Sequence, residues 1–147
     1  CFQTIQGLET LSVRIKKHSE NALKVAEWLE SQGAVAWVNY PGLKSSKYHE
    51  LSKKYLKNGQ SGIVTFGLKK GFKGGKKLTD STKIFSLLAN FGDSKSLIIH
   101  PASTTHQQLS EKEQEKTGVT ADLIRLSIGL EDPADLINDL SESMKRV

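Results

Sequence analysis

Hydrophobic residues recur at helical spacing through the first thirty residues of the chain, while charged side chains occupy the other faces. This pattern predicts one long amphipathic helix over residues 7–31, and Gly33 supplies a stop signal directly after it. The members of the apolar stripe are Leu8, Leu11, Ile15, Ala22, Val25, Ala26 and Leu29.

Shorter apolar runs bounded by turn signals predict strands. The run from Ala34 to Tyr40 ends at the turn Pro41-Gly42. The run from Leu123 to Ile128 alternates, so that Ile124, Leu126 and Ile128 share one face and Leu123, Arg125 and Ser127 share the other. The expected strands are residues 34–40, 62–68, 96–100 and 123–128.

Three further helices are expected, over residues 47–57, over 77–88 and from Asp132 to the end. The last has the clearest start: Asp132 can cap it, Pro133 is tolerated at the first helical position, and the Asp135 carboxylate meets the positive end of the helix dipole. The resulting order is helix, strand, helix, strand, helix, strand, strand, helix. This order predicts an α/β (α+β) domain with helices packed on one face of a sheet.

Composition places the chain among folded globular domains. It has 147 residues, of which 37% are hydrophobic and 25% charged. The single cysteine, Cys1, cannot form an internal disulfide or a thiolate metal cage, so a reducing, cytoplasmic compartment is expected. No apolar run approaches the roughly 18 residues that cross a bilayer, and no membrane partner is expected. The opening Cys1-Phe2-Gln3-Thr4 is read as a piece of a longer chain.

The net charge of +5 comes from one segment, residues 69–77, which holds five lysines and no acid. The chain has few arginines, and only one aromatic, Phe72, lies among the lysines, whereas nucleic-acid surfaces combine arginine with several stacking aromatics. We therefore expect a solvated loop rather than a phosphate-binding patch, and no nucleic-acid partner. The five lysines are Lys69, Lys70, Lys73, Lys76 and Lys77.

Arg125 is the residue most suggestive of chemistry, because it stands among apolar neighbours on a predicted strand. A half-buried guanidinium needs a carboxylate or phosphate partner, and its planar fork suits a carboxylate held by two hydrogen bonds. Two readings stay open from the pattern alone: an ion pair within the chain, or a clamp on a substrate carboxylate.

Other polar clusters give weaker signals. The loop from His100 to His106 gathers two imidazoles and several hydroxyls after a strand, but the two histidines have no dependable metal-ligand spacing and no metal is expected. His18 and His49 are expected to be surface or helix-packing residues. Lys83 is expected to be a solvated helix residue, and no serine-histidine-acid constellation or nucleotide-binding glycine motif is present.

Five blocks of sequence, spread in order over nearly the whole chain, resemble the C-terminal region of the Cys/Met-metabolism enzymes that use pyridoxal phosphate (PLP). Within that family, PASTTH at residues 101–106 and GVTADL at 118–123 are similar to the O-acetylhomoserine sulfhydrylase branch. The five blocks are QGLETL at 6–11, YPGL at 40–43, GIVTF at 62–66, SLIIHPASTTH at 96–106 and IRLSIGLED at 124–132.

The resemblance implies the small C-terminal domain of a fold-type I PLP enzyme. Residues 1–33 would be the connecting helix, and residues 34–147 the substrate-carboxylate-binding domain, with an antiparallel or mixed sheet covered by helices on one face. Arg125 matches the arginine that holds the substrate α-carboxylate, Asn90 a polar residue close to that carboxylate, and Thr105 a threonine lining the same side. The family's Schiff-base lysine and phosphate loop precede the QGLETL block, so no catalytic or cofactor-binding residue is expected here.

The implied activity is conversion of O-acetylhomoserine and sulfide to homocysteine, in methionine and cysteine biosynthesis. PLP would be bound mainly by an N-terminal domain that this segment lacks, and the segment would not be active alone. A full-length chain would be a cytoplasmic homo-oligomer, a homotetramer, acting on a small amino acid. The alternatives are a cystathionine γ-synthase or lyase of transsulfuration, and a non-catalytic fragment or regulatory paralogue.

Overall fold

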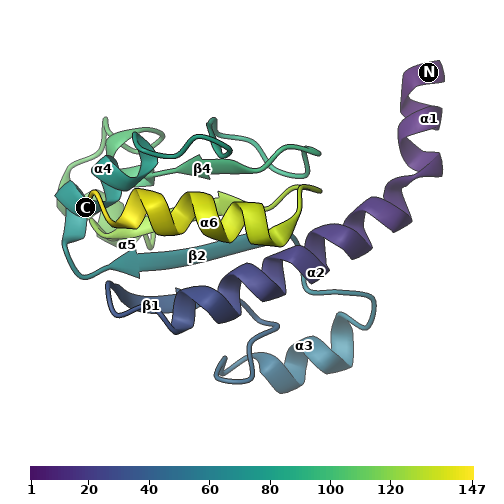
Figure 1. Cartoon of the computed structure of the whole chain (residues 1–147), viewed down its shortest axis with the longest axis horizontal. Coiled ribbons are helices and arrows are strands. Elements are labelled where there is room, and N and C mark those ends of the chain that lie inside the picture. The colour runs from purple at the N-terminus through teal and green to yellow at the C-terminus, as the bar shows by residue number, and fades with distance from the viewer.

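A computed structural model describes all residues from Cys1 to Val147. Figure 1 shows a sheet with α2 and α6 across one face, while α1 projects away from the body and α3 lies beyond β1. The helices are α1 (Phe2–Glu9), α2 (Leu11–Glu30), α3 (His49–Tyr55), α4 (Gly71–Thr79), the 3-10 turn η1 (Pro101–Ser103), α5 (Glu111–Lys116) and α6 (Pro133–Met144). The strands are β1 (Val35–Asn39), β2 (Ile63–Leu68), β3 (Ser86–Leu87), β4 (Leu97–Ile99) and β5 (Leu123–Ser127).

The five strands form one mixed sheet in the order β1-β2-β5-β4-β3. Neighbouring strands are antiparallel except for β3 and β4, which run parallel at one edge. The predicted strands and the predicted class of sheet are confirmed; β3 is an additional strand. β5 lies at the centre, so its side chains are held between β2 and β4.

The alternation along β5 assigns the two faces of the sheet. Ile124 and Leu126 are fully buried against α2, α4 and α6, and the predicted apolar face is therefore the core face. The N-terminus of α6 is also as predicted, with Asp132 Oδ1 accepting a hydrogen bond from Ala134 N at 2.7 Å and Pro133 in the first turn. Arg125 and Ser127 point to the opposite face, together with Thr65, which pairs with Arg125 across the strands.

The first predicted helix is interrupted. α1 ends at Glu9 and α2 begins at Leu11, and the Arg14 side chain bridges the break by donating to the Gly7 carbonyl at 2.6 Å. Only the second half of the apolar stripe, from Ala22 to Leu29, is buried in the core. The exposed apolar side chains of the first half are Phe2, Ile5, Leu8, Leu11, Val13 and Ile15.

The lysine-rich segment is wrongly predicted as a loop, because residues 71–79 form α4. Glycine is unfavourable inside a helix by about 1 kcal/mol, so the pattern argued against one. The structure uses the missing side chains: a Cβ on Gly75 would lie 2.5 Å from His100 Cδ2, and one on Gly74 would lie 2.7 Å from Lys70 Cβ. Close packing of α4 on its neighbours favours the helix, and the lysine side chains stay exposed as expected.

The predicted helix over 77–88 is also wrong. α4 ends at Thr79, and residues 82–85 form a turn that leads into β3. The Asp139 carboxylate on α6 accepts hydrogen bonds from the backbone N–H groups of Lys83, Ile84 and Phe85 at 2.8–3.3 Å. These bonds come from more than fifty residues away in sequence and replace the helical ones.

α5 is a helix that periodicity missed, because its sequence EKEQEK has no apolar face. Its start does carry a capping box, in which Ser110 Oγ and N donate to the Glu113 carboxylate at 2.6 and 2.8 Å. That Ser-x-x-Glu spacing was the readable signal. No helix of the structure combines the length and the apolar character needed to span a bilayer.

Candidate functional site

The candidate site lies on the face of the sheet opposite the helical core. Arg125 projects there from the centre of β5, beside Thr65 on β2 and Ile99 on β4, which are its partners across the two strand pairs. The pairing of β5 with β2 on one side and with β4 on the other therefore fixes the position of the Arg125 backbone. The guanidinium is carried on a rigid element, and only its side-chain torsions remain to be set.

Arg125 has no acidic partner in the structure. Its Nη2 donates to the main-chain carbonyl of Asn90 at 2.9 Å, and the two ion pairs of the chain are Lys53–Glu50 and Lys145–Glu142. The reading of Arg125 as half of an internal ion pair is therefore wrong. A guanidinium carries five N–H donors, so the half-buried cation keeps most of its donors for another group.

The structure brings Asn90 to Arg125 through the main chain. The Asn90 carbonyl accepts the arginine's hydrogen bond, while its side-chain Oδ1 accepts from Phe91 N at 2.9 Å. One residue further, Gly92 N donates to Ser127 Oγ at 3.3 Å. The loop of residues 88–95 is thus attached to the same face of β5 at two points.

Thr105 is not brought into contact with this pair. It lies two residues after η1, is exposed, and its hydroxyl makes a 2.8 Å hydrogen bond with His106 Nδ1. Gln114 on α5 holds the loop that carries Thr105, because its Nε2 donates to the carbonyls of His106 and Leu109 at 2.8 and 3.2 Å. Sequence reasoning missed Gln114, because a glutamine among charged residues gives no sign that it will hold a loop.

His100 is a structural residue at the base of the same loop. Its Nε2 lies 2.9 Å from the Ala121 carbonyl, which can only accept, so Nε2 carries the proton and Nδ1 accepts from Ser103 Oγ at 2.8 Å. Burial lowers the pKa of His100, in opposition to the Ala121 hydrogen bond. No group of three or more His, Cys, Asp or Glu side chains gathers with metal-binding geometry anywhere in the chain.

A cavity of about 250 Å³ adjoins the Arg125 face. Its floor is the cross-strand pair Ile63 and Ser127, and Phe91 and Gly92 of the 88–95 loop form one wall. His18 closes it from α2 and is buried, with Nδ1 donating to the Ile128 carbonyl at 2.6 Å. The helix-packing reading of His18 is confirmed, and the surface reading is wrong.

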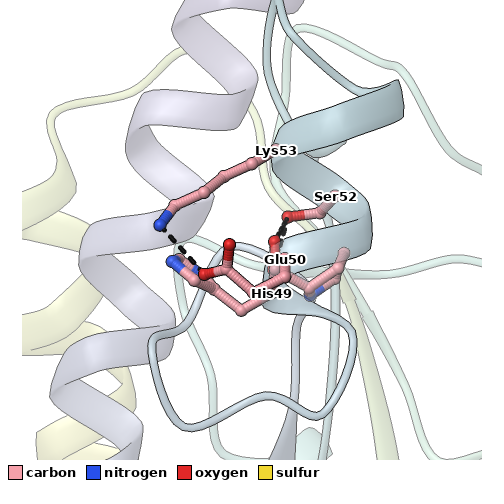
Figure 2. A network of polar contacts seen from close by, with 5 residues as sticks. His49, Glu50, Ser52 and Lys53 are labelled. Carbon is pink, nitrogen blue, oxygen red and sulfur yellow. Dashed lines mark hydrogen bonds and ion pairs between the residues drawn. The ribbon is translucent and has the colours of Figure 1, made fainter.

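One cluster resembles a hydrolase triad in composition only. His49, Glu50, Ser52 and Lys53 lie on α3, and Figure 2 shows Lys53 paired with Glu50. The Ser52 hydroxyl donates to the main-chain carbonyls of Pro41 and His49 at 2.9 and 2.8 Å, not to the imidazole. No base activates this serine, so the cluster ties α3 to the turn after β1.

The side chains present do not by themselves fit pyridoxal phosphate. The group needs a sheltered lysine amine for its aldehyde and a backbone cradle for its phosphate. No lysine of the chain is buried. The glycines of the lysine-rich segment do not form a phosphate cradle, since a Cβ on Gly74 or Gly75 would run into Lys70 or His100. What the site offers is a cationic fork for an anionic ligand.

Comparison with known proteins gives a consistent set of relatives. The family model described as Cys/Met metabolism PLP-dependent enzyme matches residues 1–145. The chain is 52% identical over 147 residues to an O-acetyl-L-homoserine sulfhydrylase of Leptospira meyeri, covering 99% of this chain and 33% of the relative. It is 48% identical over 156 residues to a homocysteine/cysteine synthase of Saccharomyces cerevisiae, covering 99% of this chain and 35% of the relative.

A solved structure agrees. The chain matches a crystal structure described as an O-acetylhomoserine (thiol)-lyase from Campylobacter jejuni with a TM-score of 0.88 and 56% identity, over 95% of this chain and 33% of that one. That crystal structure contains N'-pyridoxyl-lysine-5'-monophosphate. The chain thus spans about a third of the length of the relatives it matches.

Proposed function

We propose that this chain, which belongs to the Cys/Met metabolism PLP-dependent enzyme family, supplies the substrate-carboxylate-binding part of an O-acetylhomoserine sulfhydrylase. The reaction is replacement of the acetyl ester of O-acetylhomoserine by sulfide to give homocysteine. The observation that carries the proposal is Arg125, a half-buried cation without an acidic partner on the sheet face opposite the helical core. An anionic ligand completes its hydrogen bonds.

Arg125 would bind and orient the α-carboxylate of the substrate. Arg125 Nη2 donates to the Asn90 carbonyl, which orients the guanidinium and leaves its other N–H groups free for two parallel hydrogen bonds to a carboxylate. Holding the carboxylate at two points fixes the direction of the α-carbon, and orientation of this kind lowers the barrier of the reaction. Thr105, in the loop after η1, would line the same side of the site in the complete enzyme.

The remaining two-thirds of the enzyme would hold PLP, which supplies the electron sink when bound. Two observations support this division. The side chains present here do not fit the cofactor, and the apolar stripe of α1 and early α2 has no cover in this chain, with Phe2 72% and Leu8 61% exposed. In the complete protein, residues 1–33 would connect the PLP domain to the carboxylate-binding domain of residues 34–147.

The complete enzyme would be a cytoplasmic homotetramer. The exposed apolar stripe supports burial against further protein, and a lone exposed cysteine, Cys1, is compatible with a reducing compartment. The family's description and the names of the relatives support a role of the complete enzyme in homocysteine and methionine synthesis. A cystathionine synthase or lyase of transsulfuration would use the same carboxylate clamp and is the second candidate.

The test is a chimera in which this chain replaces the matching third of the Leptospira meyeri relative. We expect the chimera to form homocysteine from O-acetylhomoserine and sulfide. Arg125→Ala should lower kcat/KM by about 10² to 10⁴, because charge-assisted hydrogen bonds contribute roughly 1.5 to 3 kcal/mol each. Arg125→Lys keeps the charge but loses the fork, and it should also lose activity.

Arg146→Ala, at an exposed position near the C-terminus, is the matched control and should keep its kcat/KM. Melting temperature and PLP absorbance are measured on every preparation. Unchanged kcat/KM in folded Arg125→Ala chimera would end the assignment of the clamp. An inactive chimera with normal PLP absorbance would contradict the sulfhydrylase assignment, and cystathionine formation with cysteine in place of sulfide would favour the second candidate.

A further inference from the structure

Glu131 makes an unusual contact for a residue in a surface turn between β5 and α6. Its carboxylate faces no lysine or arginine within ion-pair distance; instead, Oε1 accepts from Ser96 N at 2.7 Å and Oε2 accepts from Ser96 Oγ at 2.8 Å. Both oxygens of this half-buried carboxylate thus accept hydrogen bonds from the same residue. Ser96 itself is fully buried.

The contact is built into a tight turn. Gly129 N donates to Ser96 Oγ at 2.8 Å, so this hydroxyl donates to Glu131 and accepts from Gly129 at once. A Cβ on Gly129 would lie 2.4 Å from both Glu131 Oε2 and the Ser94 carbonyl. From α2, Asn21 Nδ2 donates to the carbonyls of Gly129 and Glu131 at 3.1 and 2.8 Å, which fixes the turn against the core.

Ser96 is where the 88–95 loop ends, directly before β4. The same loop carries Asn90, whose carbonyl holds Arg125 at 2.9 Å, and Gly92, whose N–H reaches Ser127 Oγ at 3.3 Å. Leu130 N donates to the Ser94 carbonyl at 2.8 Å and adds a second attachment at the loop's end. Apart from these bonds to β5 and to the turn, the loop is exposed from Leu87 to Lys95.

We propose that Glu131 is a positioning residue for the carboxylate clamp: by holding Ser96 it sets the 88–95 loop, and through the Asn90 carbonyl it sets the direction of the Arg125 guanidinium. Calling Arg125 a clamp rests on the proposed function, but the coupling from Glu131 to Arg125 does not. Glu131 acts through Ser96 and Asn90 and touches no substrate.

The coupling is measured in this chain by NMR relaxation of the arginine Nε–H groups. The chain has three arginines, so Arg14→Lys and Arg146→Lys assign the signals. In the wild-type chain we expect the Arg125 Nε–H order parameter to lie above about 0.6, and in Glu131→Gln below it. The glutamine keeps the length of the side chain but has one acceptor oxygen in place of two, so either Ser96 N or Ser96 Oγ loses the acceptor that it has in the wild-type chain.

Asp132→Ala is the matched control. It removes the α6 cap in the same turn and should lower the melting temperature by at least about one degree, but Asp132 makes no hydrogen bond with Ser96. Its Arg125 order parameter should equal the wild-type value. Ser96→Ala removes the hydroxyl bond to Glu131 but keeps the bond from the backbone N–H; it should lower the Arg125 order parameter in the same direction and serves if Glu131→Gln does not fold.

Titration of the same samples with O-acetylhomoserine separates the two claims. Both claims are supported if O-acetylhomoserine shifts the Arg125 Nε–H signal in the wild-type chain and binds about tenfold or more weakly to Glu131→Gln. Loss of Arg125 order without any ligand-induced shift would leave the positioning intact and contradict the clamp. Unchanged Arg125 order in folded Glu131→Gln, or an equal loss in Asp132→Ala, would overturn the positioning.

Discussion

Replacing Asp139 with asparagine should destabilise the fold far more than an aspartate change on an α6 surface usually does. Asp139 is only 8% exposed, and its two oxygens accept from three consecutive backbone N–H groups, the shortest bond being Ile84 N to Oδ2 at 2.8 Å. Asparagine offers one acceptor oxygen and turns two donors toward N–H groups that need acceptors. The turn before β3 therefore loses most of its anchorage.

The size of the loss follows from those contacts. A hydrogen bond to a charged group contributes about 1.5 to 3 kcal/mol, and a buried donor without a partner adds its own penalty, so we expect a loss of about 2 to 4 kcal/mol. For a urea m-value of about 2 kcal/mol/M, the unfolding midpoint should fall by about 1 to 2 M. Amide exchange at Lys83, Ile84 and Phe85 should accelerate in parallel.

Asp135→Asn is the control for this measurement, because Asp135 lies one turn earlier on α6, is exposed, and accepts none of these bonds. Its midpoint should stay close to that of the wild-type chain. A midpoint for Asp139→Asn within about 0.3 M of wild type would refute the reasoning, since the single oxygen of asparagine cannot replace both acceptors of Asp139 at so small a cost. An equal fall in both variants would point to the charge of the helix instead.

Two further predictions concern His100 and the helix packed on it. Because burial lowers the folded-state pKa of His100 below its ordinary 6.5, the unfolded chain binds the proton more readily, and stability should fall as the pH drops through 6.5 toward that lower value. Urea midpoints at pH 7.5 and 5 should show this fall in the wild-type chain and in a His106→Gln control, and a smaller fall in His100→Gln. Equal falls in all three proteins would contradict the prediction. Gly75→Ala should lower the free energy of unfolding by about 1 to 3 kcal/mol, and with it the melting temperature, because the new Cβ would press on His100 Cδ2. Gly7→Ala in exposed α1 should keep or raise the melting temperature. Scanning calorimetry of both variants tests this, and an unchanged melting temperature in Gly75→Ala would show that His100 can move aside.

Much of this domain could be predicted from sequence because its information is local. The alternation at Leu123–Ser127 placed Ile124 and Leu126 on the core side and Arg125 on the other, which is how the structure has them. Asp132-Pro133 marked the start of α6 within one residue. In both cases a period or a cap is a property of a few consecutive residues and survives any change of neighbours.

Tertiary structure decided what depends on distant partners. His100 and Lys70 leave no room for a side chain at positions 75 and 74, which explains why glycine stands inside α4, and the distant Asp139 carboxylate accepts the N–H groups of residues 83–85 where a helix was predicted. The partner of Arg125 was likewise unreadable, since a main-chain carbonyl leaves no trace in residue type. Periodicity and capping thus determined the four longer strands, the start of α6 and the face that β5 buries. Contacts between residues far apart in sequence decided which weak helix former is held helical, which turn replaces a helix, and which way a half-buried cation points, because their free energy exists only once the sheet has assembled.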